Sequence, residues 1–149
     1  MKSILVDSEK SELIERINKL TKDTMPFWGT MSASRMLLHC TVSLQLAFGE
    51  LIPEFNEKFL QIGKQVKERV FETEMFTKNV PTTKEFLVAD NKDFEKNKII
   101  LVDYINKYSL TDVNDSRLAP HPYFGDMTVK EWGMLIWKHT NHHLTQFGV

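Results

Sequence analysis

Cysteine, proline and glycine are scarce in this sequence, with one Cys, five Pro and six Gly among 149 residues. A single Cys excludes an intrachain disulfide framework and is typical of a reducing compartment. Neither sign of charge dominates, because 19 basic residues stand against 20 acidic ones. A nearly neutral chain has no global electrostatic attraction for nucleic acid or for an anionic membrane.

Long hydrophobic runs are also missing. No stretch approaches the roughly 18 apolar residues of a membrane span, and the first residues lack the apolar region of a signal peptide. We therefore expect a cytoplasmic protein that binds neither nucleic acid nor membrane. Apolar residues still make up 42% of the chain, including 10 Phe and 3 Trp. That content can form a core without disulfides, and the length suits one domain over residues 1–149.

The Gly and Pro residues cluster near positions 26–29, 49–53, 81 and 120–125. Between these breaks, apolar residues recur at steps of three and four, which predicts helices over residues 8–20, 32–48 and 91–108. Asp7 or Ser8 is the expected cap of the first helix. Thr128 and Glu131 form a capping box at the start of a last helix. Gly49 and Gly148 are expected to end the second and last helices.

Residues 54–90 give a weaker pattern. Residues 57–70 suit a helix, whereas residues 71–76 alternate weakly, as a strand does. A small sheet between residues 70 and 90 therefore stays open, and a long crossover is the simplest expectation. The long helices predict an all-α bundle.

The five histidines carry the main functional signal, because His139 and His143 are four residues apart in the last predicted helix. That spacing places two imidazoles on one helix face, where both could bind one divalent ion. Trp132, Leu135 and Ile136 continue this face, so the pair lies toward the core. A catalytic zinc site uses three protein ligands, and His39 in the second predicted helix is the best remaining candidate.

Two other readings stay open from the residues alone. A buried His is often a core residue with one hydrogen bond, and an i, i+4 pair of histidines can arise by chance. A zincin is excluded, because the His-Glu-x-x-His motif requires Glu after the first His. Thr140 occupies that position.

Several motifs in order resemble the DUF1569 family, a branch of the DinB/YfiT-like superfamily: Pro26-Phe27-Trp28-Gly29, Met36-Leu37-Leu38-His39-Cys40, His121-Pro122-Tyr123-Phe124-Gly125, Trp132, and the segment from Lys138 to Gly148. The resemblance implies a four-helix bundle in up-up-down-down order with a long crossover. It also implies a metal held by His39, His139 and His143. Characterised members of the superfamily include bacillithiol and mycothiol S-transferases and a mycothiol-dependent isomerase, whereas DUF1569 itself has no assigned function.

These expectations describe an enzyme with one divalent ion (Zn, Ni, Fe or Mn) and an open coordination position. A low-molecular-weight thiol bound there would become a thiolate and could attack a small-molecule substrate, as in a thiol S-transferase. A hydrolase or isomerase that uses metal-bound hydroxide is the first alternative, with His121 or His142 as the base. The second is a non-catalytic helical metal-binding or interaction protein, with a closed fourth ligand such as His142 or Cys40. A homodimer through exposed helix faces is compatible with each.

The remaining candidates are secondary. His142 and Gln146 could hold an imidazole N–H from outside the ligand set, although a solvated position is the simpler expectation for each. His121 could cap a helix or line a pocket. Trp28 and Trp132 are expected as core anchors that could wall the cavity, and Cys40 as a small core residue.

Overall fold

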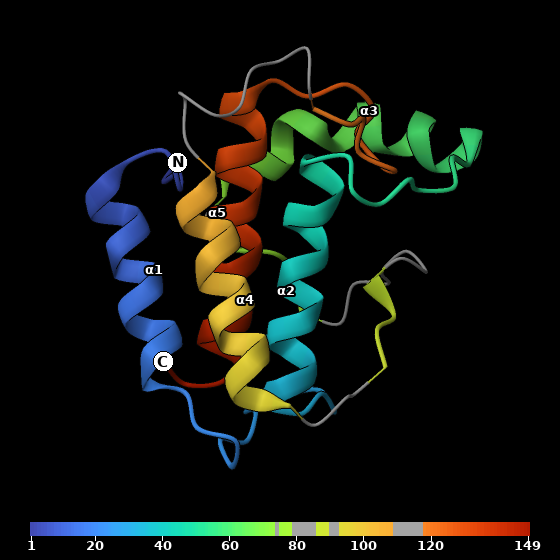
Figure 1. Ribbon diagram of the computed structural model, residues 1–149. Coiled ribbons are helices and arrows are strands. Elements are labelled where there is room, and N and C mark those ends of the chain that lie inside the picture. Colours follow the sequence, from blue (N-terminus) through green and yellow to red (C-terminus); the bar gives the residue numbers. More distant parts are fainter. Residues whose placement is uncertain (74, 79–85, 90–92, 109–117) are drawn as a thin grey trace.

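The computed structural model describes residues 1–73, 75–78, 86–89, 93–108 and 118–149. These residues form five α-helices (Figure 1): α1 (Asp7–Lys19), α2 (Ala33–Ala47), α3 (Glu57–Glu72), α4 (Phe94–Lys107) and α5 (Val129–Gln146). Within the described ranges there is no strand, and an isolated bridge pairs His121 with Gly125. The all-α prediction is therefore confirmed. No described helix is both long and apolar enough to cross a bilayer.

Two of the predicted helix starts are confirmed at their caps. The Ser32 hydroxyl accepts the Arg35 backbone N–H at the start of α2, and Thr128 and Glu131 form the complete capping box of α5. The predicted cap of α1 is wrong, because Asp7 already lies in the first turn and Val6 takes the cap position without a side-chain hydrogen bond. Gly49 and Gly148 follow α2 and α5 with φ of 70° and 77°, the left-handed values that end helices.

The weak strand pattern over residues 71–76 is also wrong where the structure describes it. Helix α3 continues through Glu72, past the predicted end at residue 70. Its amphipathic face continues with Val66, Val70 and Phe71, which pack against the core, and this helical period overrides the short alternation. The possible small sheet between residues 70 and 90 falls partly outside the described residues, at positions 74, 79–85 and 90. The predicted third helix also begins outside them, at residues 91 and 92.

Four helices pack in a ring, in which α2 contacts α4 and α5, and α1 contacts the same two helices. Figure 1 shows these four with roughly aligned axes, and α3 crossing one end. Ser34 and Asn97 meet near the starts of α2 and α4, so these two helices run parallel. The Trp137 indole N–H donates a hydrogen bond to the Glu9 carbonyl, and the Arg16 guanidinium donates one to the Asn141 side chain. The helices α1 and α5 therefore run parallel as well.

This geometry corrects the expected up-up-down-down order. The α1–α4 pair is antiparallel, because Lys10 reaches Tyr108 at one end and Lys98 reaches Leu20 at the other. The observed order is therefore up-down-down-up for α1, α2, α4 and α5. Because α2 and α4 are parallel and begin at the same end of the ring, the chain that connects them must run back along the full length of the helices. This return is the long crossover that the sequence predicts, and it carries α3.

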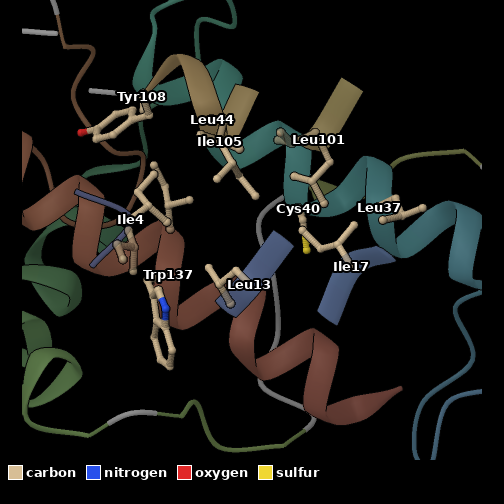
Figure 2. Packing of buried hydrophobic residues seen from close by; sticks show 14 of the residues in the cluster. Ile4, Leu13, Ile17, Leu37, Cys40, Leu44, Leu101, Ile105, Tyr108 and Trp137 are labelled. Atoms are coloured by element: carbon tan, nitrogen blue, oxygen red, sulfur yellow. The ribbon is translucent and has the colours of Figure 1, made fainter. Parts of the chain in front are cut away.

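The core fills the inside of the ring. Figure 2 shows side chains from all four helices in one cluster, among them Leu13, Leu44, Leu101 and Trp137, all nearly inaccessible to solvent. Cys40 lies in this cluster (Figure 2), and its thiol contacts Met36 Sδ at 3.7 Å. Burial raises the pKa of the Cys40 thiol far above its ordinary value. The prediction of a core cysteine is confirmed.

Three contacts fix α3 against the rest of the chain. Gly63 faces the Tyr123 carbonyl so closely that an added Cβ would lie 1.7 Å from that oxygen. Lys67 forms an ion pair with Glu131 at 2.7 Å. Lys138 is buried and donates to the Val70 carbonyl and to the Thr73 hydroxyl. These contacts hold one face of α3 over the side of α2 and α5 that carries the histidines.

Candidate metal centre

Three imidazoles from two helices converge on one point. The candidate ligand nitrogens of His39, His139 and His143 all lie within 4.8 Å of one another. The Nε2 atoms of His39 and His139 are 2.9 Å apart. The ring centroids of the three pairs are 4.6, 4.8 and 4.8 Å apart. The sequence prediction that these three residues share one site agrees with this placement.

Helix geometry explains the convergence. His139 and His143 are one turn apart on α5, so their rings lie on one face of the helix, edge to face at 79° between planes. His39 lies midway along α2, which packs directly on α5. The α2–α5 contact supplies the third ring from a position 100 residues away in sequence, which is how helical bundles build metal sites from facing helices.

The tautomer of His39 is set by a backbone carbonyl. His39 Nδ1 lies 2.9 Å from the Phe86 carbonyl oxygen. A carbonyl can only accept, so Nδ1 carries the proton and donates it. The Nε2 lone pair of the neutral ring is therefore left pointing at the other two histidines.

Gln146 sets the tautomer of His143 in the same way. Its Nε2 donates to the Trp28 carbonyl at 2.6 Å, which fixes which end of the amide is the oxygen. The Oε1 atom then accepts from His143 Nδ1 at 2.8 Å. His143 Nε2 is again the free lone pair, so two of the three rings present a lone-pair nitrogen to the site.

Electrostatics keep these rings neutral. Burial is the largest cause that lowers the pKa of His39 and His139, and it lowers the pKa of His143 to about 3. The neighbouring imidazoles lower the pKa of His139 and His143 further, because two positive rings would repel each other. Neutral imidazole is the form that binds metal.

The donor set fits a divalent ion. Three neutral imidazoles are a catalytic zinc ligand set, and Zn–N bonds of about 2.0–2.1 Å in tetrahedral geometry separate the nitrogens by about 3.3 Å. The nitrogens are 2.9 Å apart in one pair and at most 4.8 Å apart in the cluster, so the observed separations span this value. Among the described residues, no fourth His, Cys, Asp or Glu joins the cluster.

The imidazoles form part of the wall of a cavity of about 690 Å³. Its other walls are mostly apolar and come from α2, α3, α5 and the loops between them; they include Met31, Val66, Val70, Phe76, Phe86, Tyr123, Phe124 and Leu135. A volume of this size accommodates a small organic molecule. A ligand in the cavity would therefore reach the three nitrogens directly.

The structure separates the secondary candidates. Gln146 is buried and holds His143, so the expected solvated position is wrong for it. His142 is buried too and lines the cavity, with Nδ1 lacking a hydrogen-bond partner among the described residues. His121 lines the cavity, where its Nδ1 accepts the backbone N–H groups of Tyr123 and Phe124.

The two tryptophans differ in role. Trp28 lines the cavity. Trp132 is fully buried behind the wall, with its Nε1 donating to the Ala119 carbonyl at 3.3 Å and its ring against His121. Trp132 is therefore a core anchor that supports the cavity from outside it.

Sequence reasoning missed two contributors to the site. Phe86 provides the carbonyl that orients His39 and a ring against His139, at 5.5 Å between centroids; no sequence signal marks a backbone acceptor. Arg35 also lines the cavity. Its position four residues before His39 was a signal that could have found it, because that spacing puts both on one face of α2.

The fold and site together define an all-helical protein with a three-histidine cluster open to an apolar cavity. Residues 5–148 match DUF1569, described as a protein family of unknown function. The chain belongs to this family. Comparison with curated proteins and with solved structures found no significant match.

Proposed function

We propose that this protein is a divalent-metal-dependent enzyme of the DinB/YfiT-like superfamily, and that it transfers a small thiol to an electrophilic substrate. The observation that carries the proposal is the convergence of three neutral imidazoles on an apolar cavity. Hydrogen bonds to the Phe86 carbonyl and to Gln146 set the tautomers of His39 and His143. The ring of α1, α2, α4 and α5 would be the superfamily's four-helix bundle.

When bound, the ion would act as a Lewis acid that lowers the pKa of a thiol or water in its open position. His39, His139 and His143 would hold it. Phe86 and Gln146 keep the lone pairs of two ligands aimed inward, and this orientation raises metal affinity. The aromatic side chains of the cavity wall would hold the apolar part of the substrate.

The proposed thiol transfer needs no oxidant and no cosubstrate other than the thiol. The thiol loses its proton to solvent, its sulfur forms a bond to the electrophilic carbon, and the leaving group departs with the electron pair of the broken bond. The described cavity wall contains no Asp or Glu. A thiol, whose pKa is far below that of water, depends less on such a base.

A hydrolase or isomerase is the second candidate, and His142 favours it. The ring lies on the cavity wall beside His143, at 5.2 Å between centroids, and its Nδ1 has no hydrogen-bond partner among the described residues. His121 suits the role of a base less well. Its Nδ1 already accepts two backbone N–H groups, so the proton of the neutral ring is on Nε2.

The first experiment measures metal content by mass spectrometry on untagged protein purified without chelators. We expect about one divalent ion per chain in the wild type, loss of it in His143→Ala, and retention in His142→Ala. Circular dichroism checks that both variants keep their helices. The absence of stoichiometric metal in the wild type, even after incubation with Zn, Ni, Mn and Fe salts, would refute the proposal.

The second experiment measures transfer directly. Cysteine and other low-molecular-weight thiols are incubated with 1-chloro-2,4-dinitrobenzene, and thioether formation is followed by absorbance. We expect turnover that requires metal and disappears in His139→Ala. Metal-dependent ester hydrolysis that needs His142, without thiol transfer, would favour the second candidate. Bound metal with neither activity would favour a non-catalytic metal-binding protein.

A further inference from the structure

Arg35 lies in the first turn of α2, one helical turn before His39, and lines the same cavity. Its Nε atom is buried and has no hydrogen-bond partner among the described residues. A guanidinium has five N–H donors and always carries its charge. Burying such a donor without an acceptor is costly, so this position suits a group that accepts from it.

The charges around the cavity match an anion. The described cavity wall contains no Asp or Glu that could pair with Arg35. The nearby Lys138 ammonium is occupied by Val70 and Thr73. Lys78 adds positive charge close by, since its ammonium lies 4.2 Å from the centre of the Trp28 ring. Arg35 is thus a cationic group on a largely apolar wall, without a described acid to neutralise it.

We propose that Arg35 binds the carboxylate of the substrate, and that the substrate is a small organic monoanion with an apolar body. This inference deepens the proposed function, and rests on it for the assumption that the reacting group lies at the three histidines. Because Arg35 and His39 are one turn apart on the same face, one molecule can contact both. Arg35 then selects charged substrates and orients their reacting end toward the imidazoles.

Two features favour a carboxylate over other groups. The guanidinium fork matches the two oxygens of a carboxylate, and an ionised acceptor makes hydrogen bonds stronger than those of a neutral one. Arg35 is the only Lys or Arg on the described cavity wall, so the wall itself matches the single charge of a carboxylate better than the two charges of a phosphate dianion. The aromatic side chains Phe76, Phe86 and Tyr123 on those walls suit a planar or branched apolar body.

The test compares phenylacetate with phenylacetamide, which has nearly the same shape but no charge. Dissociation constants are measured by calorimetry on metal-free and on zinc-loaded protein. The variants are Arg35→Gln, which removes the charge, and Arg35→Lys, which keeps it. Arg69→Gln is the matched control, because Arg69 is exposed on α3 and is not part of the cavity wall. Zinc content is determined separately for each protein.

We expect the wild type to prefer phenylacetate in both forms, and Arg35→Gln to weaken phenylacetate binding about ten-fold or more, the usual effect of losing a hydrogen bond to a charged group. Arg35→Lys should recover part of the affinity. Phenylacetamide binding and Arg69→Gln should show no such change. Zinc content should be the same in all of these proteins.

The inference would be overturned by no detectable binding of phenylacetate, by equal binding of acid and amide, or by unchanged phenylacetate binding in Arg35→Gln. Phenylacetate binding that needs zinc but not Arg35 would also overturn it, because the ion would then be the anion's partner. A wild type that binds no zinc would refute the proposed function instead. Arg35-dependent preference for the acid in the metal-free protein would still support the carboxylate site.

Discussion

Gln146 offers the sharpest test of the candidate metal centre, because it holds a ligand without touching the ion's position. Its Oε1 accepts from His143 Nδ1 at 2.8 Å, and its Nε2 donates to the Trp28 carbonyl at 2.6 Å. Gln146→Met keeps a similar volume and removes both hydrogen bonds. His143 then loses the contact that fixes its tautomer and its ring orientation.

Two magnitudes follow from this substitution. Losing a partner of a metal-ligating His typically costs about 10–100-fold in metal affinity, or about 1.4–2.7 kcal/mol. In the metal-free protein, the buried His143 N–H and the part-buried Trp28 carbonyl each lose a partner, and together these losses should cost at least about 2 kcal/mol. The melting temperature should therefore fall by at least about 4 °C in a chain of this size.

The assay measures zinc affinity by competition with a chromophoric chelator, and the stability of the metal-free protein by thermal unfolding. Gln146→Glu is a second variant, since a carboxylate still accepts from His143 but faces the Trp28 carbonyl with an oxygen. We expect it to lose stability yet bind zinc more tightly than Gln146→Met. Gln65→Met, at an exposed position on α3, is the control. Wild-type zinc affinity in a destabilised Gln146→Met would refute the role in the metal centre.

Three further predictions concern pH, the cysteine and α3. The pKa of His143 is lowered by burial to about 3, so below the unfolded value of about 6.5 the unfolded chain binds the proton and the folded chain does not. The contribution of His143 to the stability of the metal-free protein is then complete above pH 6.5 and is lost as the pH falls toward 3. At pH 5 this residue alone should lower the free energy of unfolding by about 2 kcal/mol. Urea unfolding at pH 7.5 and at pH 5 would detect this difference, and equal midpoints at the two pH values would contradict it. Cys40, buried with a raised pKa, should react with a thiol reagent only after denaturation, and fast labelling of the native protein would contradict its burial in the core. Gly63→Ala should destabilise the protein by about 1–3 kcal/mol or more, because the new Cβ would clash with the Tyr123 carbonyl. The control variant Gln65→Ala should not be destabilised. Equal urea midpoints for the two variants would contradict the close packing of α3 on Tyr123.

Local sequence signals determined most of the helices and one half of the candidate site. The capping box at Thr128 and the start of the second helix at Ser32 depend on neighbouring residues, so their positions could be predicted and were confirmed. The spacing of His139 and His143 is equally local, because one turn of helix separates them whatever the rest of the fold does. His39 was the best remaining candidate for the third ligand from the residues alone, and the family resemblance supported that choice.

The tertiary structure alone decided what these residues meet. The direction of each helix in the ring depends on contacts between distant segments, such as Asn97 with Ser34, and the expected order was wrong for that reason. The sequence offered Gln146 as a possible partner of an imidazole N–H, with a solvated position as the simpler expectation, and Arg35 was given no role. In the structure, Gln146 is a buried partner of His143 because the Trp28 carbonyl lies beside it. Arg35 faces the cavity because α2 turns that face toward α5. Local periodicity fixes which side chains share a face, but only the packing of helices far apart in the chain fixes what that face contacts.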